Sequence, residues 1–173
     1  MLIGNENWRG RLIRFAPLFL WISVIFLLSS NMGSTSHTSI FVRPILNFLF
    51  PNSPEETLQL YHSYVRKAAH FTEYAVLAYL AIWAFCRFPD RLLRAVVYSL
   101  LIVVSVAVID EYNQSFNLSR TGSWYDVLID ISGGAAMMAT ICIWNLLRRG
   151  HRLISSRHSK DLTEKTSINR NFV

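Results

Sequence analysis

The chain has 173 residues, of which 52% are hydrophobic and 16% are charged, and its formal net charge is +6. This composition is too apolar for a soluble domain of this size and indicates an integral membrane protein. The positive charge does not point to nucleic acid, because the basic residues form clusters beside apolar segments, where they attract anionic lipid headgroups.

Four segments are long and apolar enough to cross a bilayer, since about 20 residues at 1.5 Å each span the hydrocarbon. They are Leu12–Ser30, Lys67–Phe85, Leu92–Ile109 and Tyr125–Leu147. Arg9, Arg11 and Arg14 lie before or at the start of the first span, as in a signal peptide, but no small-x-small cleavage site comes after Leu28, so we expect the span to be retained. The sequence therefore predicts an all-α protein, a bundle of four transmembrane helices.

Most basic residues lie in or beside three of the segments that separate or flank these spans. Thirteen of the 17 Lys and Arg lie in the first 14 residues, between Arg87 and Arg94, or after the fourth span. The other four are Arg43, Arg66, Lys67 and Arg120. Because cytoplasmic loops carry the excess of positive charge, both termini are predicted to be cytoplasmic. Residues 1–150 form the predicted membrane domain and residues 151–173 a basic, disordered tail.

The longest external loop, about Asn31–Arg66, has internal structure of its own. Its segment Ile40–Phe50 places apolar residues on one helical face, and we expect it to rest at the outer membrane interface. A helix is predicted to start at Pro54, with Ser53 as its cap, and to continue through Tyr64 toward the second span. The connections between the second, third and fourth spans are short, which predicts antiparallel neighbours.

Ionisable side chains occur within or at the ends of three of the predicted spans, although each costs about 2.5–3.5 kcal/mol at the centre of a bilayer. The second span contains Lys67, His70 and Glu73, and the fourth contains Asp126 and Asp130. At the outer end of the third lie Asp110, Glu111 and the amide residue Gln114. Their spacing of mostly three or four residues puts them on one face of each helix. With the predicted topology all of them fall in the outer half of the membrane, which indicates one polar site built by three helices.

Three residues near this site also have simple structural explanations. Asp126 follows Ser123 at the spacing of a capping box, so it could satisfy backbone N–H groups of the fourth span. Lys67 could extend to the interface from a helix end, and Arg120 could pair with Glu111 or Asp110 to hold the loop. The sequence leaves these alternatives open.

His70, Glu73 and Asp130 lie a turn or more inside their spans, so a functional role is favoured over a purely structural hydrogen-bond network. The run of small residues Ser132–Ala136 predicts close helix packing in the fourth span.

Three motifs occur in order along the chain: KAAHFTEYAVLA at Lys67–Ala78, DEYNQSF at Asp110–Phe116 and RTGSWYDVLIDISG at Arg120–Gly133. They resemble the three signatures of the VanZ-like membrane proteins, and the similarity covers roughly Leu12–Leu147. The chain departs from the family pattern at Asp130, where Asn is frequent, and at Leu118-Ser119, in place of a Pro-Gly pair.

The resemblance implies a protein of the bacterial cell membrane, in a family named for low-level resistance to the lipoglycopeptide teicoplanin. The motif residues that it implies for the site are Lys67, His70, Glu73, Asp110, Glu111, Gln114, Arg120, Asp126 and Asp130.

Three functions are compatible with such a site. The first is binding of an anionic amphiphile, a cell-envelope lipid or a lipid-tailed antibiotic, by Lys67, His70 and Arg120. The second is a membrane-embedded hydrolase or transferase that uses His70 with carboxylates and a metal, although no nucleophile motif or zinc spacing supports it. The third is a proton-coupled transporter. We expect membrane lipids as partners, no nucleic acid and no cofactor, and the sequence does not determine an oligomeric state.

Overall fold

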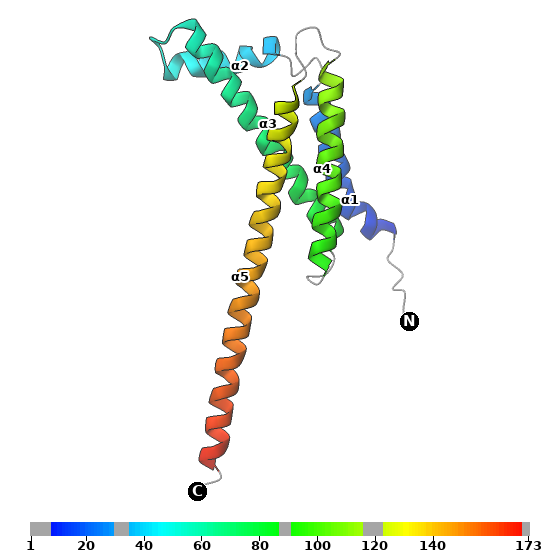
Figure 1. Cartoon of the computed structure of the whole chain (residues 1–173), viewed down its shortest axis with the longest axis vertical. Coiled ribbons are helices and arrows are strands. Elements are labelled where there is room, and N and C mark those ends of the chain that lie inside the picture. The colour runs from blue at the N-terminus through cyan, green and yellow to red at the C-terminus, as the bar shows by residue number, and fades with distance from the viewer. Residues whose placement is uncertain (1–7, 30–34, 87–90, 116–122, 171–173) are drawn as a thin grey trace. The chain divides into compact units, whose positions relative to one another are not determined.

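The computed structural model describes residues 8–29, 35–86, 91–115 and 123–170, and these residues form five α-helices and no strand (Figure 1). The helices are α1 (Trp8–Ser29), α2 (Thr35–Leu49), α3 (Glu55–Phe85), α4 (Leu92–Ser115) and α5 (Trp124–Arg170). The chain divides into two units, Met1–Met138 and Ala139–Val173, and the candidate site lies in the first.

Four of the helices are long and apolar enough to cross a membrane, as the sequence predicts. The candidate spans are Leu12–Ser29, Glu55–Phe85, Leu92–Ser115 and Trp124–His151. They confirm an all-α membrane protein. The main difference concerns α3, in which the helix predicted after Pro54 and the second span form one continuous helix of 31 residues. At 1.5 Å per residue α3 is about 46 Å long, which exceeds the hydrocarbon thickness of about 30 Å.

The start of α3 differs from the prediction by one residue. Pro54, rather than Ser53, is the N-cap, and its carbonyl accepts hydrogen bonds from the N–H groups of Thr57 and Leu58. A proline has no N–H to leave unpaired at a helix start, and the cap has no side-chain hydrogen bond here. The prediction of Ser53 as the cap is therefore wrong, whereas that of a helix beginning beside Pro54 is confirmed.

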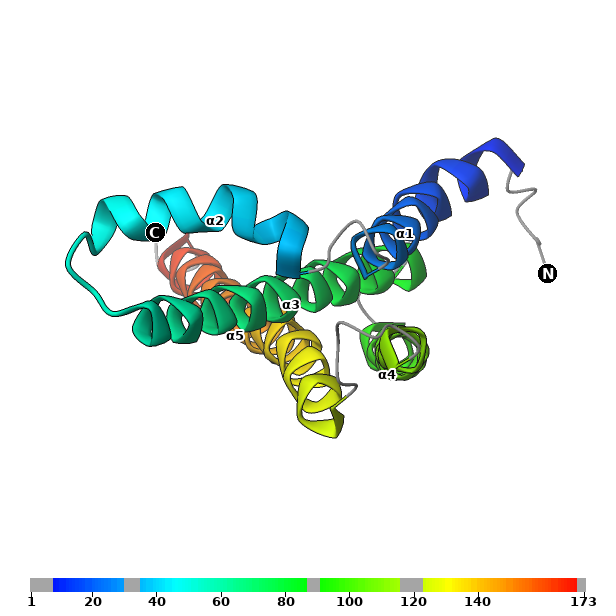
Figure 2. The ribbon, with the colours of Figure 1, turned by 90° about the horizontal axis from the view of Figure 1, so that it is seen from above.

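Helix α2 contains most of the predicted amphipathic segment and packs against α3. Figure 2 shows α2 beside the N-terminal half of α3. Arg43 of α2 forms an ion pair with Glu55 of α3, and Leu46 is buried between the helices. Phe48 on α2 is 86% exposed, so this helix presents an apolar surface that α3 does not cover.

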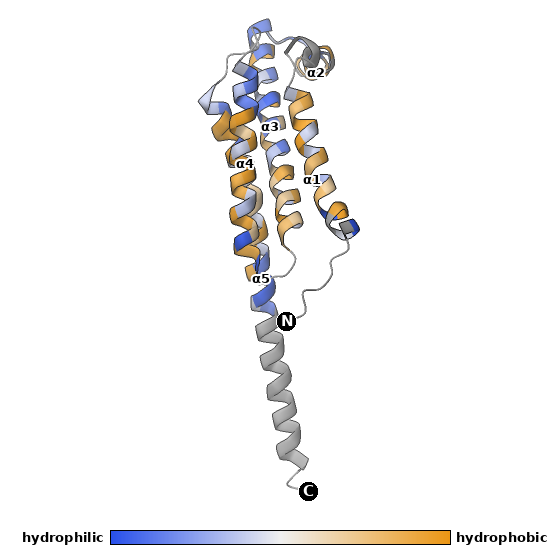
Figure 3. Cartoon of the chain, turned by 90° about the vertical axis from the view of Figure 1, so that its right-hand side faces the viewer, coloured by the Kyte–Doolittle hydropathy of each residue, from blue (hydrophilic) through white to orange (hydrophobic). Residues whose placement is uncertain are grey.

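The core of the first unit forms where α3 packs against α1 and α4. Helix α3 buries Tyr74 and Leu77 together with small residues, and α4 buries Val103 and Ala107. Small residues let helices approach closely where lipid provides no hydrophobic driving force. Large apolar side chains such as Phe19 on α1 remain exposed, as expected of a surface that faces lipid. Figure 3 shows hydrophobic residues along α1 and α4, with hydrophilic ones gathered where α4 ends and α5 begins.

Two adjacent glycines of α5 lie against the other helices, within the predicted run Ser132–Ala136. A Cβ atom on Gly133 would overlap the carbonyl oxygen of Phe71 on α3. A Cβ atom on Gly134 would lie 2.8 Å from a methyl carbon of Val103 on α4. Because these two glycines have no side chain, α5 can lie close to both α3 and α4. The prediction of close helix packing is confirmed.

Helix α5 extends farther than the sequence predicts. It continues to Arg170, through residues 151–170 that were expected to be disordered. No proline, and no glycine after Gly150, interrupts this stretch, so the sequence contains no strong signal that ends the helix. The domain boundary at Gly150 stays a prediction.

Candidate functional site

The predicted polar residues gather at the end of the first unit where α4 ends and α5 begins. The buried members are Asp110, Glu111, Gln114 and Asp130, and the partly buried ones are His70, Glu73 and Asp126. Lys67 is exposed. Arg120 lies outside the residues that the structure describes, so its predicted role is not addressed by the structure.

His70 is the meeting point of the three helices. Its Nδ1 atom lies 3.5 Å from Oδ1 of Asp130 on α5 and 3.8 Å from Oε2 of Glu73, one turn along α3. Side-chain atoms of His70, Asp110 and Asp130 all lie within 4.8 Å of one another. We call His70, Glu73, Asp110 and Asp130 the polar cluster. Acidic and basic groups from separate helices therefore come together, as the sequence predicts.

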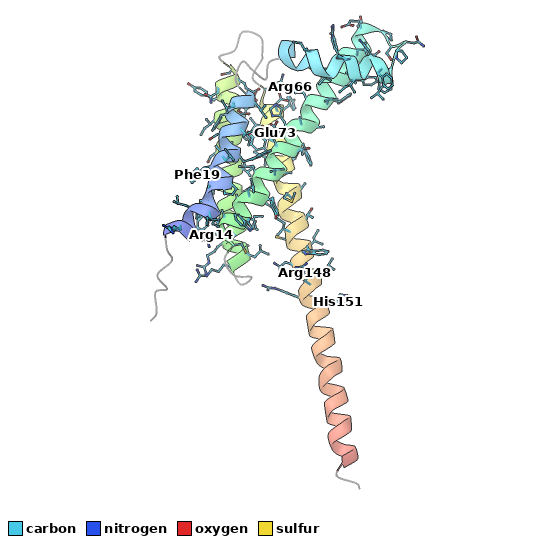
Figure 4. The ribbon with its side chains drawn as sticks, turned by 180° about the vertical axis from the view of Figure 1, so that it is seen from behind. Arg14, Phe19, Arg66, Glu73, Arg148 and His151 are labelled. Carbon is cyan, nitrogen blue, oxygen red and sulfur yellow. The ribbon has the colours of Figure 1, made fainter. Side chains whose placement is uncertain are left out.

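A chain of hydrogen bonds holds one side of the polar cluster. The Nε2 amide of Gln114 donates to Oδ2 of Asp110 at 3.0 Å. Nη2 of Arg66 donates to Oε1 of Gln114 at 3.1 Å, which connects α3 with α4. Figure 4 shows the positions of Arg66 and Glu73 on α3. Arg66 is a residue that the sequence analysis did not assign to the site, although its position four residues before His70 puts it on the same helix face.

Glu111 holds the start of α5. One of its carboxylate oxygens accepts a hydrogen bond from the backbone N–H of Ser123, the residue before α5. The Ser123 hydroxyl in turn accepts a bond of 3.3 Å from the N–H of Tyr125. In a capping box the Ser123 N–H would donate to Asp126, so the structure gives that role to Glu111 instead.

Helix α1 also reaches this level, through a residue that the sequence analysis did not consider. The indole Nε1 of Trp21 donates a hydrogen bond of 3.0 Å to the backbone carbonyl of Glu73. The acceptor is a backbone carbonyl of helix α3, so no pattern in the sequence could have predicted that Trp21 contacts the site. The bond fixes α1 against the turn of α3 that carries Glu73.

A pocket opens between α3 and α5 beside the polar cluster. Its volume is about 130 Å³, and its lining residues are Ser63, Arg66, Lys67, His70, Asp126 and Ile129. We call it the α3–α5 pocket. Two basic side chains and one imidazole line this pocket together with one carboxylate, so the lining favours an anion. His70 belongs to both the pocket and the polar cluster.

A second, more apolar pocket lies between α4 and α5. It has a volume of about 220 Å³ and is lined by Val108, Glu111, Tyr112, Ser115, Ser123, Trp124 and Val127. Glu111 is its one ionisable carboxylate, and that residue already bonds to Ser123. The electrostatic contrast with the α3–α5 pocket is clear, because none of the described residues that line this pocket is Lys or Arg.

Comparison with known proteins identifies the family. The chain matches the family model described as VanZ/LLP1 over residues 15–146, and it belongs to that family. The matched range contains every predicted site residue. No curated protein and no solved structure matches the chain.

Proposed function

We propose that this member of the VanZ/LLP1 family binds the anionic headgroup of an amphiphile in the α3–α5 pocket. The observation that carries the proposal is the lining of this pocket, where Arg66 and Lys67 lie beside His70. A guanidinium can bind two oxygens of a phosphate or carboxylate at once, and an ammonium adds a compact charge. Asp126, on the opposite wall, can accept hydroxyl or amide donors of the same headgroup.

The size of the α3–α5 pocket restricts what can enter it. Pockets for drug-sized ligands typically have volumes of about 300–1,000 Å³. A volume of about 130 Å³ accommodates a phosphate or carboxylate group but not the peptide core of a glycopeptide antibiotic. A cell-envelope lipid, whose acyl or prenyl tail stays in the bilayer, therefore fits better than an antibiotic held as a whole.

The depth of the pocket also suits a lipid headgroup. Arg66 lies about 20 residues before the end of α3 at Phe85, a length of about 30 Å that matches the hydrocarbon layer. The pocket thus opens at one border of the apolar layer. With the topology expected from the positive-inside rule this border is the outer one, and α2 rests its apolar surface on the same side.

Binding of phosphatidic acid to the purified full-length protein in detergent tests this function, with phosphatidylcholine of the same acyl chains as the comparison lipid. We expect the wild type to prefer phosphatidic acid. Arg66→Ala should raise the dissociation constant at least about tenfold, because a charge-assisted hydrogen bond contributes about 1.5–3 kcal/mol. Lys67→Ala should weaken binding less, since its side chain is exposed.

Arg43→Ala is the matched control, because Arg43 is an exposed cation on α2, outside the pocket. Equal binding of the two lipids, or equal losses in Arg43→Ala and Arg66→Ala, would contradict a specific headgroup site. Teicoplanin serves as a further probe. Competition between teicoplanin and phosphatidic acid in the wild type alone would connect the site with antibiotic handling.

His70 favours catalysis as the second candidate function. Its imidazole lies in the wall of the pocket and within 3.5 Å of a buried carboxylate, an arrangement that can orient a general base. If the wild type turns over a bound lipid and the His70→Gln variant does not, the binding site is an active site.

A further inference from the structure

We infer that His70, Asp110 and Asp130 form a binding site for a divalent transition-metal ion, Zn²⁺ or Mn²⁺. One ligand atom of each residue lies within 4.8 Å of the ligand atoms of the other two. Metal–ligand bonds of about 2.0–2.2 Å place the ligand atoms of one ion roughly 3–3.5 Å apart. His70 and Asp130, at 3.5 Å, already meet this spacing, and Asp110 lies within 4.8 Å of both.

The surroundings of Asp130 provide an independent indication. Asp130 is 1% exposed, and its Oδ1 atom has no hydrogen-bond partner among the described residues. That oxygen faces Nδ1 of His70, from the neighbouring helix. A buried carboxylate oxygen without a donor is unfavourable by several kcal/mol in apolar surroundings, and a cation between Asp130 and His70 would remove this penalty.

The orientation of Asp110 also fits a metal ligand. Its Oδ2 atom is held by the amide of Gln114, which is itself held by Arg66. Metal-binding carboxylates are commonly fixed in this way by a hydrogen bond from outside the ligand set. This bond is made to Oδ2 alone, so it does not occupy Oδ1 of Asp110.

Charge balance points in the same direction. Glu73, Asp110 and Asp130 put three carboxylates beside one imidazole at membrane depth. Negative charge at this depth is costly, and a divalent ion would offset two of these charges at once. Protonated carboxylates are the competing arrangement, and the experiment below distinguishes the two.

The donor set selects the class of metal. One imidazole nitrogen and two carboxylate oxygens suit Zn²⁺ or Mn²⁺ better than Ca²⁺ or Mg²⁺, which prefer oxygen alone. The sequence analysis expected no cofactor because Lys67, His70 and Glu73 lack zinc spacing within one helix. The ligands inferred here come from three helices instead. Three protein ligands leave coordination positions open, as in sites where a metal also binds water or an external ligand.

The test uses purified full-length protein, treated with a chelator and then loaded with Zn²⁺ or Mn²⁺. We expect the wild type to retain about one equivalent after desalting, measured by elemental mass spectrometry, and to gain thermal stability by mass action. Asp130→Asn should weaken metal affinity at least tenfold and lose the thermal shift. Co²⁺, added as a spectroscopic probe, should show d–d absorption in the wild type but not in Asp130→Asn.

Asp126→Asn is the matched control, because Asp126 lies one turn away on α5 and outside the ligand set. It should bind metal as the wild type does. A wild type without stoichiometric metal, or equal losses in Asp126→Asn and Asp130→Asn, would overturn the site and favour protonated carboxylates. Asp110→Asn provides a second ligand variant if Asp130→Asn does not fold. The inference is separable from headgroup binding, since Lys67→Ala, a change in the α3–α5 pocket outside the Arg66–Gln114–Asp110 chain, should still bind metal. Metal-free protein can still be tested with phosphatidic acid.

Discussion

At the scale of single residues, Gln114 connects the two parts of the candidate site. It donates to Asp110 in the polar cluster and accepts from Arg66 in the α3–α5 pocket. Gln114 is 2% exposed, so neither bond is easily replaced by water. An amide is suited to this position because it donates and accepts at the same time.

Replacing Gln114 by alanine should therefore affect both stability and binding. The loss of two buried hydrogen bonds leaves Asp110 and Arg66 without these contacts, at a cost of about 1–3 kcal/mol for each group. We expect Gln114→Ala to lower the melting temperature in detergent and to weaken binding of phosphatidic acid. Asn113→Ala, at the exposed neighbouring position, is the control and should change neither. Unchanged headgroup affinity in Gln114→Ala would show that Arg66 does not depend on this contact.

Single residues also show where the sequence was informative. His70 and Asp130 could be predicted as neighbours because charges at membrane depth must find partners, which limits their possible arrangement. Arg66 could not be assigned, since the predicted span began one residue later and treated it as part of a loop. Trp21 could not be found at all, because its acceptor is a backbone carbonyl that every residue of a helix possesses.

At the scale of helices, the packing of α5 depends on two adjacent glycines, Gly133 and Gly134, each of which contacts a different neighbouring helix. Gly133 lies against backbone atoms of α3, and Gly134 lies against a side chain of α4. The predicted run of small residues indicated close packing, but the identity of each neighbour required the structure. A helix is 3.6 residues per turn, so adjacent positions point about 100° apart and face different helices.

This difference predicts a specific rescue. Gly134→Ala should destabilise the protein by about 1–3 kcal/mol, the usual cost of overpacking, because the new methyl group meets Val103. In the double variant Gly134→Ala with Val103→Ala, the added methyl group occupies part of the space left by the two methyl groups of Val103. Its melting temperature should lie above the value expected from adding the two single effects.

Gly133→Ala is the comparison, because the obstacle there is the backbone carbonyl of Phe71, which no side-chain truncation removes. Adding Val103→Ala should not restore the melting temperature of the Gly133→Ala variant. Equal rescue of both glycine variants would show that α5 does not have this register against α3 and α4.

At the scale of the whole molecule, the number and order of the membrane helices could be predicted because hydropathy and span length are properties of the sequence alone. The continuity of α3 could not be decided, since Glu55–Arg66 is too polar to register as a span. The predicted disorder after Gly150 was based on composition, which does not exclude a charged helix. The direction in which the helices cross the membrane stays a prediction from the distribution of Lys and Arg.

This topology can be tested by cysteine accessibility in intact cells. After Cys86 and Cys142 are replaced by alanine, Glu56→Cys at the exposed start of α3 should react with a membrane-impermeant thiol reagent added outside. Arg91→Cys, exposed before α4, should react only after the membrane is permeabilised. The physical reason is the retention of basic loops on the cytoplasmic side. Labelling in the opposite order would move Arg66 and the α3–α5 pocket to the inner leaflet, and the proposed ligand would then be a lipid of the cytoplasmic surface.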